Sequence, residues 1–260
     1  MSVEPPVFDF HARLGPGAGA APGLLAAMDA SGIARAAVSA GGVMDLDALS
    51  ARIMDGCAPD ARAEPDNEHV LRACEASQGR LVPFYFADPH AGAEPYREVA
   101  HRFRGLELSP AVHGIGFDDP RTRALVEVAA EHRQPVYVVC LARTGCRAAD
   151  LVALAARFPE VPFVYGHAGV IGIDTYGIGV VSARPNIHVE TSGCLTVAVR
   201  SALERVGPSR VLFGTEHPLQ HPDVELAKYA ALGLDPPTWR QIAWRNAHRL
   251  LGEEPDDDRP

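Results

Sequence analysis

Short apolar runs alternate with longer amphipathic stretches along almost the whole chain. The short runs are rich in Val, Ile and Phe, as expected of strands that are buried on both faces. The longer stretches repeat apolar residues every three or four positions, which is typical of helices that bury one side. This alternation predicts parallel strands joined by crossover helices. Eight runs fit the strand pattern, at residues 7–13, 34–41, 80–86, 105–109, 135–141, 162–169, 186–193 and 210–218.

Eight strands with helices between them predict a single-domain α/β fold, the (β/α)8 or TIM barrel. A length of 260 residues suits this fold, and the barrel is expected to span residues 1–252. Residues 42–66 are long for a barrel loop and are interpreted either as a lid over the site or as a surface excursion. Residues 253–260 hold like charges and prolines, which predicts a disordered acidic tail.

The composition is that of an ordinary globular protein, with 47% hydrophobic and 22% charged residues. A net charge of −9 offers no basic field to a phosphate backbone, so a small-molecule substrate is favoured over nucleic acid. The sequence has neither a signal-peptide pattern nor an apolar run long enough to span a membrane, which predicts a cytoplasmic protein without membrane contact. Five cysteines without a CxxC pair predict reduced, buried thiols. A homo-oligomer and a monomer both stay open.

The polar residues that end the predicted strands are the first candidates for chemistry, because barrel enzymes place catalytic groups at the carboxyl ends of their strands. His11 and Arg13 end the first strand and share a face, since side chains alternate along a strand. His167 ends the sixth strand and Glu216 the eighth, while Glu107 lies on the fourth. These five residues are therefore expected to approach one another at one end of the barrel.

Weaker candidates lie next to these positions. His217 follows the eighth strand and is expected to alternate away from the barrel interior. His113, in the loop after the fourth strand, is a candidate substrate contact because such loops carry specificity. On the seventh strand one face holds three polar residues, and the sequence leaves open whether that face points inward: His188, Glu190 and Ser192.

Several segments, in the correct order, resemble the amidohydrolase-related family, whose members include aminocarboxymuconate-semialdehyde decarboxylase and related decarboxylases. FDFHARLG resembles the opening D-x-H-x-H strand of that family. FPEVPFVYGHAG resembles its sixth-strand histidine motif, RVLFGTEHP its F-G-[ST]-D-x-P motif, and IAWRNAHRLLG its closing N-A-x-x-L-[FL] helix. The resemblance runs from about residue 7 to residue 252. It implies a TIM-barrel hydrolase or lyase of the decarboxylase kind.

The metal ligands of the resembling enzymes are altered here. Those enzymes hold a divalent ion, usually zinc, with two first-strand histidines, a fifth-strand histidine and an eighth-strand aspartate. His11 is retained, but Arg13 stands at the second position, and a guanidinium cannot be a ligand. Val139 stands at the fifth-strand position, and Glu216 replaces the aspartate, where it is able to pair with Arg13 in a bidentate fork.

A zinc site needs at least three protein ligands, and the inherited positions supply two. We therefore expect no metal cofactor. The alternative is a Zn²⁺ or Mn²⁺ site in which His11 and Glu216 are joined by either His167 or Cys140. The resemblance implies a proton-transfer or electrostatic role for His167, which suits a side chain that titrates near neutral pH.

Two interpretations of Arg13 stay open. It is an anchor for a substrate carboxylate or oxyanion, or it is half of a buried ion pair with Glu216 or Glu107. Glu107 stands where similar sequences often carry lysine, and it is counted with Arg13 and His113 among the candidate substrate contacts.

The leading hypothesis is a metal-independent enzyme that acts on a small carboxylated substrate by hydrolysis, decarboxylation or a related lyase or ring-forming step. Its candidate catalytic residues are His167, His11, Arg13 and Glu216. The first alternative is a zinc- or manganese-dependent hydrolase or decarboxylase with a reduced ligand set. The second is a noncatalytic barrel that binds a ligand or a partner protein.

Overall fold

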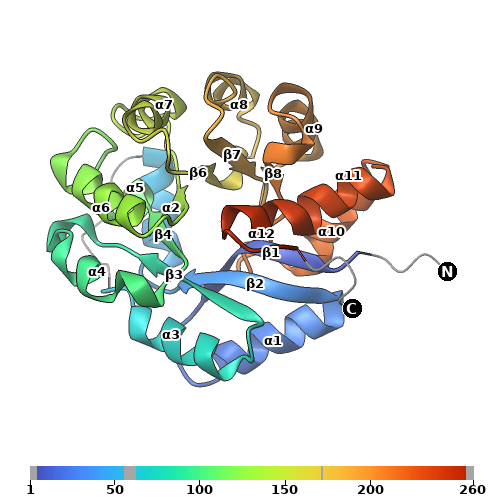
Figure 1. Cartoon of the computed structure of the whole chain (residues 1–260), viewed down its shortest axis with the longest axis horizontal. Coiled ribbons are helices and arrows are strands. Elements are labelled where there is room, and N and C mark those ends of the chain that lie inside the picture. The colour runs from blue at the N-terminus through green and yellow to red at the C-terminus, as the bar shows by residue number, and fades with distance from the viewer. Residues whose placement is uncertain (1–4, 56–62, 171, 256–260) are drawn as a thin grey trace.

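Eight parallel strands form one sheet in chain order, which confirms the predicted (β/α)8 barrel. The computed structural model describes residues 5–55, 63–170 and 172–255. Each observed strand overlaps a predicted run, and the helices are arranged around the strands (Figure 1). The strands are β1 (Val7–Leu14), β2 (Ile33–Ala40), β3 (Leu81–Phe86), β4 (Gly105–Leu108), β5 (Val136–Val138), β6 (Phe163–Tyr165), β7 (Ile187–Glu190) and β8 (Val211–Leu212).

Helices follow each strand, and several begin where an aspartate side chain accepts a hydrogen bond from the first turn. Asp66, Asp119, Asp174 and Asp235 cap four of them in this way. The described helices are α1 (Ala20–Ser31), α2 (Leu46–Asp55), α3 (Asn67–Ala76), α4 (Glu94–Val99), α5 (Pro110–His113), α6 (Pro120–Glu131), α7 (Ala148–Arg157), α8 (Thr175–Val181), α9 (Thr196–Arg205), α10 (Pro222–Ala230), α11 (Pro236–Arg240) and α12 (Asn246–Leu250).

The ring of strands closes between β1 and the segment that follows β8. Three backbone hydrogen bonds join the two: Phe10 N to Phe213 O (2.8 Å), Arg13 N to His217 O (2.7 Å) and Glu216 N to His11 O (2.8 Å). The chain at the carboxyl end of β8 is thereby held beside that of β1. This seam brings the first and last predicted strand-end residues together.

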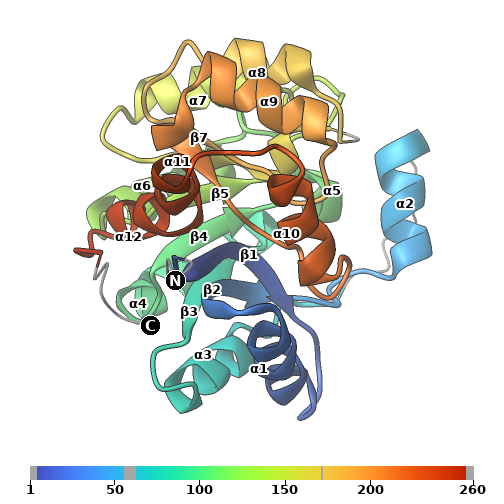
Figure 2. The ribbon, with the colours of Figure 1, turned by 90° about the vertical axis from the view of Figure 1, so that its right-hand side faces the viewer.

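Most of the buried apolar side chains of the described residues belong to two groups, and a third, small group holds Ala111, Leu141 and Cys146. The largest group lies between the strands and the surrounding helices, and the second largest fills the barrel interior with rings such as Phe8, Phe84 and Tyr137. Trp244 and His248 pack on Phe8 with ring centres 6.2 and 5.4 Å away. α12, which carries His248, and α2 lie at opposite ends of the barrel (Figures 1 and 2). The floor is therefore filled, which leaves the other end for a ligand.

The predicted excursion at residues 42–66 contains α2, which stands apart from the body of the barrel (Figure 2). None of its side chains is buried. Arg52 ties it to α5 by donating to the Val112 carbonyl at 3.1 Å. Residues 56–62 of the excursion, with Cys57, lie outside the described residues. The lid therefore stays a prediction.

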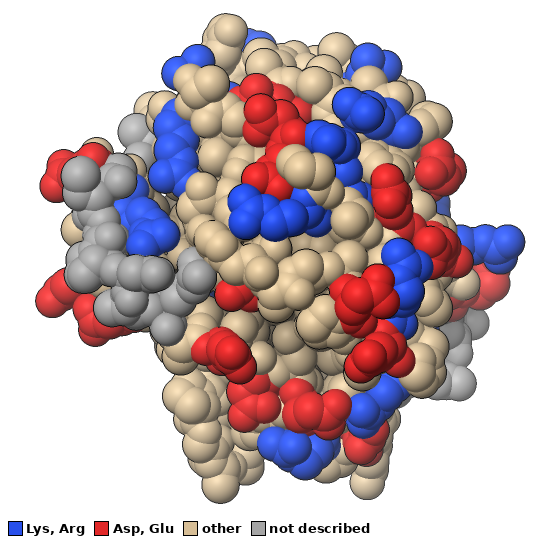
Figure 3. Space-filling view, turned by 90° about the vertical axis from the view of Figure 1, so that its left-hand side faces the viewer, with Lys and Arg blue, Asp and Glu red and all other residues tan. Residues whose placement is uncertain are grey.

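The start of the predicted acidic tail is tied to the barrel, because Glu253 pairs with Arg35 at 2.6 Å. Residues 256–260 of that tail lie outside the described residues, so its disorder stays a prediction. The four described cysteines are buried free thiols, as expected: Cys74, Cys140, Cys146 and Cys194. Within the described chain, no helix combines the length and apolar character needed to cross a bilayer. On the face drawn in Figure 3, basic and acidic side chains are interspersed.

Candidate active site

Three side chains from different strand ends converge on one point. They are His11 on β1, His167 after β6 and Glu216 after β8, and one donor atom from each lies within 4.8 Å of the others. His11 Nε2 is 2.6 Å and His167 Nε2 is 3.8 Å from Glu216 Oε2. The sequence predicted these three residues to meet, and the structure brings them together.

The backbone at two of these residues takes a conformation that side chains rarely adopt. His167 has φ 58° and Glu216 has φ 57°, both in the left-handed region. Such strain tends to gather at functional sites, where it re-aims a side chain. Gly166 makes the His167 turn feasible, because a Cβ there would lie 2.4 Å from Cζ of Tyr137.

Arg13 forms a buried ion-pair network on one side of this cluster. Its Nε donates to Glu216 Oε1 at 2.8 Å and its Nη2 donates to Glu107 Oε1 at 2.7 Å. The other oxygen of Glu107 accepts from Ser39 Oγ. The ion-pair interpretation of Arg13 thus describes its contacts in this structure, and Glu107 joins the cluster through it.

The charges of this network hold one another in the ionised form. Burial alone would raise the pKa of Glu216, but Arg13, His11 and His167 outweigh it and hold the pKa well below its usual range. Burial would lower the pKa of His11, yet Glu216 and Glu107 raise it above the ordinary value. The same two carboxylates raise the pKa of Arg13 against the effect of burial. The site therefore favours positive charge beside Glu216.

A second network, centred on Glu190, lies on the other side of the cluster. Glu190 Oε2 accepts from Tyr137 OH (2.7 Å), from His167 N (3.1 Å) and from Ser192 Oγ (3.0 Å). Ser192 Oγ is also 2.9 Å from His167 Nδ1. The polar face of the seventh strand, which the sequence left unassigned, thus points inward.

Tyr137 is a site residue that the sequence reasoning missed. Its ring stacks on His11 with 4.0 Å between ring centres and 13° between planes. Its hydroxyl lies 3.4 Å from His167 Nε2, so it contacts both histidines. The signal was available, because Val139 stands at a ligand position and therefore faces the site. Alternation along the strand places Tyr137, two residues earlier, on the same face.

Asp9, the aspartate of the D-x-H motif, fixes β1 to the segment after β8. Its carboxylate accepts from His11 N at 3.0 Å and from Thr215 N at 2.9 Å. It also accepts from Thr215 Oγ1. Burial raises the pKa of Asp9 to about 7. Because Thr215 directly precedes Glu216, Asp9 sets the position of Glu216 relative to His11.

A cavity of about 460 Å³ adjoins the cluster at the open end of the barrel. Arg13, His167 and Glu216 form its charged wall. The rest is mostly apolar and includes Val43, Met44, Leu49, Val112, Val139 and Leu219. Three of the side chains that line it are large, apolar and exposed: Leu46, Ile53 and Leu219. The cavity therefore opens through an apolar rim.

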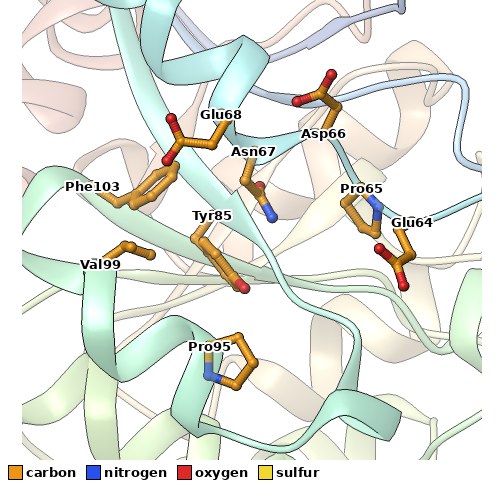
Figure 4. Close-up of a pocket in the computed structure, with 9 residues that line it drawn as sticks. All are labelled: Glu64, Pro65, Asp66, Asn67, Glu68, Tyr85, Pro95, Val99 and Phe103. Atoms are coloured by element: carbon orange, nitrogen blue, oxygen red, sulfur yellow. The ribbon is translucent and has the colours of Figure 1, made fainter.

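A second hollow, of about 470 Å³, lies outside the ring of strands (Figure 4). One side is formed by Tyr85, Pro95, Val99 and Phe103, and the other carries Glu64, Asp66 and Glu68. Its described lining holds neither histidine nor cysteine and shares no residue with the cavity at the strand ends. The converging donors therefore adjoin the cavity at the strand ends and not this hollow.

The remaining candidates lie away from the cavity lining. His113 is buried, with its ring edge-on to Phe86 at 5.3 Å, and it does not line the cavity. His217 is also absent from the lining, in agreement with its predicted direction. Cys140 is buried and outside the converging cluster, and burial raises its thiol pKa well above the ordinary value. Among the candidates for a third ligand, the geometry favours His167.

Comparison with known proteins identifies the family. The family model described as amidohydrolase matches residues 8–252. The chain belongs to the amidohydrolase family. Membership makes it an enzyme of the amidohydrolase superfamily. Among functionally curated proteins, none matches this chain significantly.

Solved decarboxylases share the fold of this amidohydrolase. The 5-carboxyvanillate decarboxylase of Novosphingobium aromaticivorans, solved with manganese, is 14% identical, with a TM-score of 0.68 over 95% of this chain and 97% of its own. A Rhizobium 2,6-dihydroxybenzoate decarboxylase is 18% identical (TM-score 0.69; 95% and 99% covered). A Polaromonas dihydroxybenzoic acid decarboxylase, solved with manganese and 2-nitroresorcinol, is 16% identical (TM-score 0.67; 95% and 97% covered).

The expectation of a metal-free site is wrong. It counted only the ligand positions inherited on the first, fifth and eighth strands, whereas the turn after β6 brings His167 within reach and makes three converging donors. His11 Nε2 and Glu216 Oε2 are buried and face each other without hydrogen-bond geometry, and neither has another hydrogen-bond partner. Two imidazoles and a carboxylate suit Zn²⁺ or Mn²⁺. Structures of the same fold that hold manganese agree with this correction.

Proposed function

We propose that this amidohydrolase is a divalent-metal-dependent decarboxylase of small carboxylic acids with a flat, apolar body. The observation that carries the proposal is the convergence of His11, His167 and Glu216 at one wall of an otherwise apolar cavity. These three residues would hold Mn²⁺ or Zn²⁺. The ion would act as a Lewis acid that binds the substrate's oxygen atoms and withdraws electron density.

Charge balance supports a cation at this point. The two networks contain one guanidinium, that of Arg13, and three carboxylates, those of Glu107, Glu190 and Glu216. Buried charges need partners, so a site with this excess of carboxylates attracts either protons or a metal cation. An anionic substrate would be repelled by the carboxylates alone, and a divalent ion reverses that balance.

Arg13 would orient the substrate carboxylate. Its two hydrogen bonds to Glu107 and Glu216 use two of the five N–H groups of a guanidinium, and the side chain lines the cavity. The two carboxylates fix the plane of the guanidinium, so the remaining N–H groups have a defined direction. A planar fork of this kind suits a carboxylate.

The apolar wall favours decarboxylation over hydrolysis. Val112, Val139 and Leu219 line the cavity with side chains that offer a water molecule no hydrogen-bond partner. Moving a carboxylate out of water raises its energy, and the loss of CO2 disperses that charge. A hydrolase would instead need an ordered water in the same space. An aromatic ring fits a cavity of about 460 Å³ with such walls.

The test combines metal content with product analysis. Protein purified without a tag or chelator, then supplemented with Mn²⁺ or Zn²⁺, is expected to hold about one ion per chain by elemental mass spectrometry. It should release CO2 from hydroxylated benzoates such as 2,6-dihydroxybenzoate, and a chelator should stop this release until metal is restored. Turnover of carboxylates in excess chelator would overturn the metal requirement. Hydrolysis of esters, lactones or amides without CO2 release would overturn the reaction class.

A matched pair of variants locates the metal. Glu216→Gln should lower metal occupancy strongly, because an amide is a poor substitute for the carboxylate ligand. His217→Ala changes the next residue, whose side chain does not line the cavity, and should leave occupancy near that of the unaltered chain. Equal occupancy in both variants would place the ion elsewhere.

A further inference from the structure

The hydroxyl of Ser192 has two polar neighbours and a single proton. Its Oγ lies 3.0 Å from Glu190 Oε2 and 2.9 Å from His167 Nδ1. Glu190 also accepts from Tyr137 OH, from His167 N and from Ser192 N. Four donors directed at two oxygens fit an ionised carboxylate, which can only accept. The Ser192 proton therefore points to Glu190, and Ser192 has to accept the proton carried by His167 Nδ1.

We propose that Ser192 and Glu190 are positioning residues that hold the neutral ring of His167 as its Nδ1–H tautomer. Nε2 of that tautomer carries a free lone pair, and it lies 3.8 Å from Glu216 Oε2, on the side where the donors converge. The use of this lone pair as a metal ligand rests on the proposed function. The tautomer itself is a property of the metal-free chain and does not depend on it.

The opposite tautomer has partners of its own, so the choice is a real competition. A proton on Nε2 would point toward Tyr137 OH at 3.4 Å or Glu216 Oε2 at 3.8 Å. Both distances are longer than the 2.9 Å contact at Nδ1. Tyr137 gives its own proton to Glu190 and is free to accept one. Loss of the Ser192 hydroxyl would therefore move the proton to Nε2 and occupy the lone pair.

Two side chains of α10 hold the backbone on either side of Ser192 in place. Lys228, on α10, donates from Nζ to Thr191 O at 2.7 Å and to Cys194 O at 3.0 Å. Glu225, one turn earlier on α10, accepts from Gly193 N at 3.0 Å. These bonds fix the segment 191–194 on both sides of Ser192. The hydroxyl is thus presented to His167 by a rigid support rather than by a free loop.

Glu190 owes its position to a glycine on the neighbouring strand end. A Cβ at Gly214 would lie 2.3 Å from Glu190 Oε1, so a larger residue would displace the carboxylate. Glu190 is fully buried, with no exposed side-chain surface. A buried carboxylate that accepts from four donors has little freedom to turn. It therefore defines the direction of the Ser192 proton.

The direct test is nitrogen NMR of the metal-free chain labelled with ¹⁵N-histidine. The His167 signals, assigned by comparison with His167→Gln, are followed through pH to the range where the ring is neutral. We expect the pattern of a protonated Nδ1 and an unprotonated Nε2. The reverse pattern would overturn the proposal, whether or not the Ser192 variants fold. This measurement uses no metal and no substrate.

Three variants separate the hydroxyl from mere packing. Ser192→Ala should shift the tautomer toward Nε2–H, and Ser192→Thr, which keeps the hydroxyl, should restore Nδ1–H. Ser39→Ala removes the matching hydroxyl from Glu107 in the other network and should leave the His167 signals unchanged. Unchanged signals in folded Ser192→Ala would overturn the role of Ser192.

Metal affinity is the second readout. Loss of an orienting partner of a ligand histidine commonly costs about 10–100-fold in affinity, and we expect that range for Mn²⁺ binding to Ser192→Ala by titration calorimetry. An unchanged affinity together with a shifted tautomer would overturn the link to metal binding. If the unaltered chain shows the Nδ1–H pattern but binds no Mn²⁺ or Zn²⁺, the proposed function fails while the tautomer assignment is supported.

Discussion

Two buried glutamates, Glu107 on β4 and Glu190 on β7, flank the candidate metal cluster and use opposite kinds of partner. Glu107 accepts from the guanidinium of Arg13 and from Ser39. Glu190 accepts only neutral groups among its described hydrogen-bond partners: a phenol, a serine hydroxyl and two backbone amides. The Glu107 network therefore balances charge, whereas the Glu190 network directs protons.

This difference shows how one barrel separates stability from chemistry. A guanidinium between two carboxylates is a fixed ion pair, and its removal leaves uncompensated charge in the interior. Each neutral donor around a carboxylate contributes less to the free energy of unfolding, but together these donors decide which atom carries a proton. We therefore expect changes on the Glu107 side to alter folding most and changes on the Glu190 side to alter ligand geometry most.

The largest effect is expected for Arg13→Ala. This change leaves Glu107 and Glu216 buried without their guanidinium and should lower the free energy of unfolding by about 3–5 kcal/mol. Urea denaturation of the metal-free protein measures it. Arg97→Ala removes an exposed ion pair with Glu131 and should cost no more than about 1 kcal/mol. Similar losses in both variants would contradict the importance of burial.

A second effect belongs to the barrel floor, which tests whether acid sensitivity lies outside both networks. Burial, with Arg249 and Arg210, lowers the pKa of His188 to about 4. Because the unfolded chain takes up the proton near pH 6.5, stability should fall as pH drops from there to about 4, by up to about 3 kcal/mol. His188→Gln should lose less stability over this range in urea denaturation. Exposed His132→Gln should behave like the unaltered chain.

The most direct comparison of the two glutamates uses the same substitution in each. Glu190→Gln and Glu107→Gln each remove one negative charge, so a difference between them reports hydrogen-bond direction. In Glu190→Gln the new amide can donate to Ser192, which frees the serine proton to turn toward His167. Mn²⁺ affinity should then fall roughly 10–100-fold by calorimetry, and by less in Glu107→Gln. Equal losses would mean that charge alone matters.

The smallest effect is expected for Tyr137→Phe. It removes one hydrogen bond to Glu190 but keeps the ring that stacks on His11, so stability should fall by about 1 kcal/mol. The same change removes the Tyr137 hydroxyl, an acceptor for a proton on His167 Nε2. His167 should therefore stay protonated at Nδ1. Thermal unfolding and nitrogen NMR check the two parts. A tautomer shift here would count against the Ser192 assignment.

The sequence was enough to predict the fold because its hydrophobic periods match the barrel at every strand. Boundaries differed mainly at the carboxyl ends. β6 stops at Tyr165, since the left-handed turn at His167 leaves the extended conformation, whereas the predicted run continued to residue 169. Alternation also predicted that His11 and Arg13 act together, and both reach Glu216.

The candidate site was predicted only in part. The face of β7 that carries Glu190 and Ser192 depends on register with its neighbours, which one strand pattern does not contain. The third converging donor arises from a backbone turn at His167 rather than from a strand position. A ligand count made on strand positions therefore came out one short. His113, by contrast, lies after β4 as predicted, at the end of α5, but its ring is buried beside Phe86 and does not line the cavity.

Lys228 is the only lysine in the chain, and its side chain is 9% exposed where it supports the segment beside Ser192. Amine-directed reagents therefore have one lysine to modify, and folding hides it. The rate at which such a reagent reacts with Lys228 measures how often the contact between α10 and the end of β7 opens. The modification rate of this one lysine thus reports how often the contact beside the candidate active site opens.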